Sequence, residues 1–89
     1  MQGHRLPDND NSQVMTFGDY QKDGDDLWWL CLPVPDPTTG RPICTALPPK
    51  ETPSRPGWSV AEHDDGTITV SPSINYQGVW HGYLERGVW

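Results

Sequence analysis

The chain has 89 residues, of which 34% are apolar, and twelve acidic residues against six basic ones give a formal net charge of −6. This length allows one domain with one core, and the nine glycines and ten prolines disfavour a helical bundle, in which both residues are costly. No apolar run approaches the roughly 18 residues of a membrane-spanning helix, and no basic stripe is present that would bind nucleic acid through its phosphates. We therefore expect an all-β, mainly antiparallel fold with little or no helix: a small sheet, sandwich or partly open barrel of about five to seven short strands.

The first residues are polar and lack periodicity. Residues 1–12 are expected to form a flexible arm, in which His4 and Arg5 are solvated, ahead of a single β domain over residues 13–89. The arm contains no apolar segment of the kind found in signal peptides. This favours a soluble protein of the cytoplasm.

The first half of the domain contains three strand candidates. Residues 13–17 form a short one, and Asp23-Gly24 is a turn signal that follows it. Residues 27–32 are apolar at every position, which predicts a central strand covered on both faces. A loop stiffened by prolines, residues 33–42, leads into the third candidate at residues 43–47.

If the last two candidates pair as a hairpin, Cys31 lies opposite Cys44 and Trp29 opposite Ala46. Opposed residues of antiparallel strands have Cβ atoms roughly 4.5–5.5 Å apart, so the thiols would be neighbours. They could be buried reduced thiols, a disulfide or half of a metal site. Reduced thiols are the expectation, because the cytosol disfavours disulfides.

The second half contains the clearest hairpin. Residues 48–57 include four prolines, so they are expected to be an extended connection without regular structure. Residues 58–63 and 67–71 alternate in polarity around an Asp-Asp-Gly turn at 64–66, which predicts an antiparallel pair. Ser71-Pro72-Ser73 predicts a bend after that pair.

A last strand is expected at residues 79–84, after a turn at Gln77-Gly78. Its alternation places Trp80 and Leu84 on one face and His81 and Tyr83 on the other.

Aromatic residues are abundant, with five Trp, three Tyr and one Phe. Most of four tryptophans are expected in the core, with one or two exposed at a dimer or partner surface: Trp28, Trp29, Trp58 and Trp80. Trp89 follows a glycine turn at 85–87 and is expected to pack against the domain.

Trp58, residues 67–74, residues 81–84 and Gly87 together resemble a family of small uncharacterised phage and bacterial proteins. Members show a Trp, a Thr-x-x-Pro-Ser-Ile-like segment, and a His-Gly/Ser-aromatic stretch that leads into a glycine turn. The resemblance covers roughly the C-terminal third and implies a phage or mobile-element origin and a β fold, without an established activity. Many relatives carry a cysteine before that histidine, where this chain has Trp80, so a family metal site does not carry over.

We predict a non-enzymatic function: a small phage accessory protein that binds a host or phage protein and modulates a host or defence protein. Interface anchors are typically aromatic, and the expected binding residues are His81, Tyr83, Trp80 and Trp28. The acidic charge suits a basic partner, and the same surface could form a homodimer. Neither a membrane nor direct nucleic-acid binding is expected, and no cofactor is predicted.

Two alternatives stay open. One is a metal- or small-ligand-binding module, in which zinc would be held by Cys31, Cys44, His63 and His81. The other is a small hydrolase-like enzyme assembled from a serine, a histidine and an acid: Ser71 or Ser73, His81, and Asp64 or Asp65. No nucleophile elbow or phosphate loop supports the second alternative.

Overall fold

The computed structural model describes residues 1–10, 12, 14–24, 27–47, 58–76 and 78–89. These residues form no helix and seven strands: β1 (His4–Arg5), β2 (Asp19–Asp23), β3 (Leu27–Pro35), β4 (Pro42–Leu47), β5 (Ser59–Glu62), β6 (Ile68–Tyr76) and β7 (Trp80–Leu84). A four-stranded sheet has the order β1-β2-β3-β4, and a three-stranded sheet has the order β5-β6-β7. Every neighbouring pair is antiparallel except β1 and β2. The expected all-β, mainly antiparallel class is confirmed.

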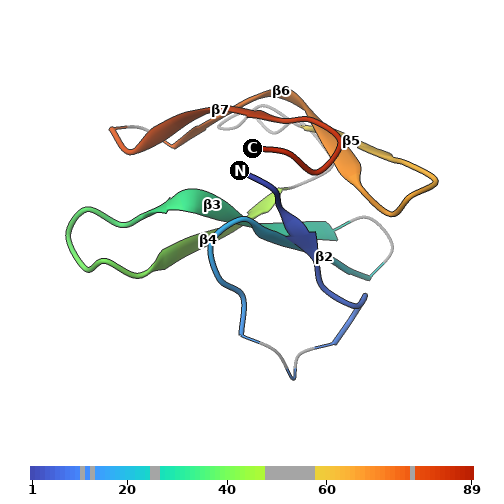
Figure 1. Cartoon of the computed structure of the whole chain (residues 1–89), viewed down its shortest axis with the longest axis horizontal. Coiled ribbons are helices and arrows are strands. Elements are labelled where there is room, and N and C mark those ends of the chain that lie inside the picture. Colours follow the sequence, from blue (N-terminus) through green and yellow to red (C-terminus); the bar gives the residue numbers. More distant parts are fainter. Residues whose placement is uncertain (11, 13, 25–26, 48–57, 77) are drawn as a thin grey trace.

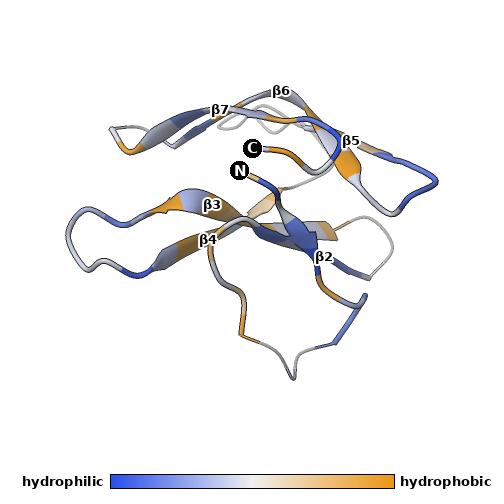
Figure 2. Cartoon of the chain, viewed as in Figure 1, coloured by the Kyte–Doolittle hydropathy of each residue, from blue (hydrophilic) through white to orange (hydrophobic). Residues whose placement is uncertain are grey.

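The two sheets lie face to face as two layers, and both termini lie between them (Figure 1). Both sheets contribute to one apolar core: Tyr20, Trp28, Leu30, Leu32, Ile43, Leu47, Ile68, Val70, Ile74 and Leu84. The hydrophilic residues gather at places such as β2 and the turn between β5 and β6 (Figure 2). Burial of these apolar side chains between the layers is the main force that holds the layers together.

β3 is the central strand of its sheet, as predicted, with β2 on one side and β4 on the other. Trp28, Leu30 and Leu32 are buried in the core between the sheets. The pairing of β3 with β4 also has the predicted register, because Cys31 lies opposite Cys44 and Trp29 lies opposite Ala46.

The two cysteines form a disulfide, with Cα atoms 4.1 Å apart. The expectation of reduced thiols is therefore wrong. The expectation assumed that the thiols are in the cytosol. The strand register places Cys31 opposite Cys44, and this pairing is sufficient to bring the two sulfur atoms together. Cys31 is buried, whereas Cys44 is exposed.

The N-terminal residues belong to the folded domain and are not an arm beside it. β1 pairs in parallel with β2, and Gln2 forms an antiparallel bridge with Val88 near the C-terminus. The backbone N–H of Gly3 donates to the carbonyl of Gly87 at 2.7 Å. Residues 1–12 were expected to form a flexible arm because they lack apolar periodicity, but residues 2–5 are held by backbone hydrogen bonds, which leave no such pattern.

Two local expectations differ from the structure. The described part of residues 13–17 contains no strand, and Val14 is 93% exposed. β6 runs on through Ser71 and Ser73, with a register shift against β7 between Val70 and Ile74 where a bend was expected. The predicted connection over residues 48–57 lies outside the described residues. The hairpin around residues 64–66 is confirmed, since β5 pairs with β6 there.

We expect reduction of the disulfide to lower the free energy of unfolding by about 2–3 kcal/mol. The bond joins positions 13 residues apart, and a cross-link of that span removes conformational freedom from the unfolded chain. Urea unfolding with and without a reductant measures this effect, and Cys44→Ser is the matched control, because a reductant should not change its stability. A wild-type midpoint that does not respond to reductant would contradict the prediction.

Candidate functional site

A tight turn after β7 folds the end of the chain back along that strand. Glu85 and Val88 exchange two backbone hydrogen bonds of 2.9 Å each. The two residues between them, Arg86 and Gly87, have φ angles of 46° and 75°. Two consecutive left-handed residues are the signature of a type I′ turn, which places Trp89 beside β7.

The Trp89 side chain is fixed by contacts to several parts of the molecule. Its indole Nε1 donates to the carbonyl of Gly18 at 2.9 Å, and its backbone N–H donates to the carbonyl of Met1 at 2.8 Å. Its ring meets Trp80 edge-on, with centroids 5.4 Å apart and planes at 75°, a favourable aromatic geometry. The expectation that the terminal aromatic packs against the domain is confirmed.

A hollow of about 400 Å³ opens at this edge of the molecule, and we call it the terminal pocket. It is lined by Tyr83, Glu85, Val88 and Trp89. Tyr83 is 59% exposed and Val88 is 45% exposed. The pocket thus offers two aromatic side chains, one aliphatic side chain and one carboxylate to a bound group.

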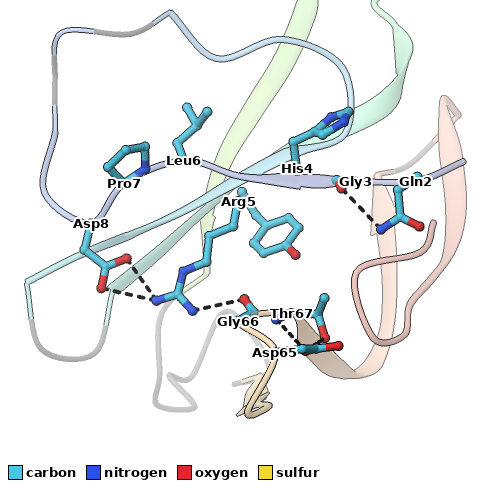
Figure 3. A pocket seen from close by; sticks show the side chains of 11 residues that line it. Gln2, Gly3, His4, Arg5, Leu6, Pro7, Asp8, Asp65, Gly66 and Thr67 are labelled. Carbon is cyan, nitrogen blue, oxygen red and sulfur yellow. Dashed lines mark hydrogen bonds and ion pairs between the residues drawn. The ribbon is translucent and has the colours of Figure 1, made fainter.

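A second hollow, of about 500 Å³, lies between β1 and the turn that joins β5 to β6 (Figure 3). The Arg5 side chain crosses it. Arg5 Nη1 donates to Glu62 Oε2 at 2.9 Å and to the carbonyl of Gly66 at 3.0 Å, and Nη2 donates to both carboxylate oxygens of Asp8. The guanidinium also lies 5.0 Å from the ring centroid of Trp28, within reach of a cation–π interaction.

Charge pairing with Arg5 and burial shift the pKa values of side chains in and around this hollow. The hydrogen bond from Arg5 is the main cause that lowers the pKa of Glu62, and Lys22 adds to the effect. Burial acts to lower the pKa of Arg5, but its hydrogen bonds to Asp8 and Glu62 outweigh burial, so that its pKa is raised. Burial also raises the pKa of Tyr20, which lines the same hollow. Arg5 and the carboxylates of Asp8 and Glu62 therefore neutralise one another. These contacts connect β1 of one sheet to β5 and the turn after it in the other sheet.

The four predicted binding residues have different environments. Trp28 is only 5% exposed and lies beneath the cations of Arg5 and Lys22, so it offers no binding surface. Trp80 is half-buried and packs on the core. His81 and Tyr83 are exposed on β7, so these two are accessible to a partner.

The residues of the hydrolase alternative are only partly brought together. His81 Nε2 lies 3.0 Å from Ser73 Oγ. Asp65 instead accepts hydrogen bonds from the backbone and hydroxyl of Thr67, at the turn between β5 and β6. Within the described ranges, no carboxylate contacts His81 to complete a nucleophile–base–acid set.

The four residues of the metal alternative are not assembled either. Cys31 and Cys44 are joined in a disulfide in the four-stranded sheet, so they offer no thiolate. His63 contacts the Thr69 hydroxyl at 2.7 Å, and His81 contacts Ser73. The part of the chain that the structure describes holds no group of three or more His, Cys, Asp or Glu side chains suited to a metal ion.

Comparison of the chain with protein-family models, with curated proteins and with solved structures finds no match. The resemblance to small phage and bacterial proteins therefore stays a prediction. Among the described residues, no helix has the length and apolar character needed to cross a membrane.

Three residues of the terminal pocket were not among the predicted binding residues: Glu85, Val88 and Trp89. The signal that could have identified them is the glycine turn at 85–87. A two-residue turn of this kind folds the residues after it onto the strand before it. It therefore brings Val88 and Trp89 next to Tyr83.

We expect Glu62→Gln to lower the free energy of unfolding at pH 7 by roughly 0.5–1 kcal/mol, the range for an ion pair at the surface. The pKa of Glu62 is lowered in the folded protein from an ordinary value of 4.5, so the stabilisation is fully present above that value. It is lost as the pH falls through the folded pKa, and wild type and variant should converge at pH values below that folded pKa.

Urea unfolding between pH 3 and pH 7 measures this convergence, with Glu85→Gln as a control that removes a carboxylate away from Arg5. A constant difference between wild type and Glu62→Gln over the whole range would show that the ion pair is not its cause.

Proposed function

We propose that this chain is a non-enzymatic binding protein that recognises another protein through the terminal pocket. The observation that carries the proposal is that Tyr83 and Val88 are exposed beside the indole of Trp89. This indole is held in place by its hydrogen bond to Gly18 and by its contact with Trp80. Aromatic side chains at well-formed pockets supply most of the binding energy in many interfaces. A side chain that is fixed before binding loses little conformational entropy on binding.

The surroundings of the pocket support the same function. Two of the five large apolar side chains that are exposed among the described residues, Tyr83 and Val88, line this one pocket. Neighbouring exposed apolar groups mark interaction sites more often than scattered ones do.

We propose neither catalysis nor a cofactor, and we expect the partner to be a host or phage protein. His81 lies on the same strand as Tyr83 and can extend the contact surface. The hydrogen bond between Ser73 and His81 then has a structural role and not a catalytic one.

The disulfide bears on where such a protein works. Disulfides persist in oxidising compartments and are rare in the cytosol, where thiols are kept reduced. Cys44 is exposed, so reductants can reach the bond. We therefore infer that the protein works in an oxidising environment, in place of the cytoplasm that the sequence alone favoured.

Substitution of Tyr83 tests the binding surface. We expect a protein that co-purifies with the wild type to be lost with Tyr83→Ala, because truncation of an interface anchor costs about 2 kcal/mol or more, roughly a 30-fold loss of affinity. Tyr76→Ala is the matched control, since Tyr76 is 42% exposed but belongs to β6 and not to the pocket.

The measurement is affinity purification from host cells with quantitative mass spectrometry, followed by binding curves for the purified partner. Equal retention of the partner by Tyr83→Ala and the wild type would contradict the proposal. So would the absence of any stoichiometric partner.

A further inference from the structure

We propose that the terminal pocket binds the arginine side chain of a basic segment of the partner protein. This inference rests on the proposed function and names the chemistry that the pocket recognises.

Each residue that lines the pocket matches one part of an arginine side chain. The guanidinium is planar and weakly hydrated, so it stacks on aromatic rings such as those of Tyr83 and Trp89. The Glu85 carboxylate can accept two parallel hydrogen bonds from it. Val88 supplies apolar surface for the methylene groups of the arginine stem. The volume, about 400 Å³, lies within the range of about 300–1,000 Å³ that is usual for ligand pockets.

The charges around the pocket favour a cation. Among the described residues that line the pocket, Glu85 is the one with a charged side chain. The neighbouring Arg86 lines a different hollow, together with acidic residues of the turn between β5 and β6, and among the described residues it forms no ion pair with Glu85. Arg86 therefore does not neutralise Glu85. The net charge of −6 attracts a basic segment over longer range and speeds its association.

The pocket is rigid enough to select a planar group. The Trp89 indole is fixed at its Nε1 by Gly18 and at its ring by Trp80. The backbone of Glu85 is fixed by its hydrogen bonds with Val88. Because the aromatic ring and the carboxylate are both attached to this ordered turn, an arginine side chain meets a site that needs little rearrangement.

The test uses two short peptides that differ in one atom group. The first is Gly-Ser-Arg-Ser-Gly with blocked ends, and the second carries citrulline, the uncharged isostere of arginine, in place of the arginine. The full chain labelled with ¹⁵N is titrated with each peptide, and the Trp89 indole N–H signal and the Tyr83 backbone signal are followed by NMR. We expect saturable shifts with the arginine peptide and at least tenfold weaker binding of the citrulline peptide.

Variants separate the carboxylate from the general charge of the protein. Glu85→Gln keeps the shape of the side chain and should weaken binding of the arginine peptide about five- to tenfold, in line with loss of a charge-assisted pair. Asp64→Asn also removes one negative charge, but from the turn between β5 and β6, and should leave the affinity within twofold of the wild type. The NMR spectrum of each free variant shows whether it is folded.

Equal binding of the two peptides, unchanged binding by Glu85→Gln, or no shift at either signal would each overturn the arginine inference. If any of these occurs while Tyr83→Ala still loses the natural partner, the proposed function stands and only the arginine chemistry is wrong. If Tyr83→Ala keeps the partner, the proposed function itself is wrong.

Discussion

The close approach of three backbone segments at Gly3 is the constraint on which the rest of this structure depends. A Cβ atom at Gly3 would lie 2.7 Å from the carbonyl oxygen of Gly18 and 2.9 Å from that of Gly87, distances that real Cβ atoms do not occupy. Only glycine therefore lets the N-terminal strand pass between the residues that precede β2 and the turn that follows β7. One consequence is the hydrogen bond from Gly3 to Gly87, and another is the 3.3 Å bond from the His4 N–H to the Gly18 carbonyl.

The terminal pocket depends on the same backbone arrangement. The Gly18 carbonyl that accepts from His4 also accepts from the Trp89 indole, so the N-terminal strand and the terminal tryptophan share one acceptor. The turn residue Gly87 is likewise crowded, because a Cβ atom there would lie 2.9 Å from the Tyr20 hydroxyl. The sequence thus places glycine at two points of close contact, Gly3 and Gly87. These contacts position Trp89, which forms one wall of the pocket.

The elements that could be predicted from the sequence are those held by apolar side chains. The apolar run at residues 27–32 and the alternation around Ile68 and Val70 identified β3 and β6, because burial of one face leaves a visible period. The hairpin register between Cys31 and Cys44 was also predictable, since strand pairing follows directly from the loop between them. The oxidation state of the two cysteines could not be predicted, because it depends on the surroundings of the protein as well as on geometry.

The elements that could not be predicted are held by polar contacts. β2 has the sequence Asp-Tyr-Gln-Lys-Asp, and its buried Gln21 donates to the carbonyls of Pro7 and Asp10, so an amide takes the place of an apolar residue. β1 is held by backbone bonds and by Arg5, which a sequence pattern assigns to solvent. The same difference applies to the site. Strand alternation placed the predicted binding residue Tyr83 on the face of β7 opposite Leu84, but the covering of Trp28 by Arg5 and Lys22 arises only from tertiary contacts.

The most direct test of this account is the stability of Gly3→Ala, measured by urea unfolding beside Gly24→Ala. Gly24 has a φ of 71° and open space around its Cβ position, so its substitution reports only the backbone cost, about 1 kcal/mol. We predict that Gly3→Ala costs about 2–3 kcal/mol, the range for a forced overlap in a packed region, and that it shifts the NMR signal of the Trp89 indole. A Gly3→Ala variant as stable as the wild type, with an unchanged Trp89 signal, would contradict the claim that this close approach positions the N-terminal strand and Trp89.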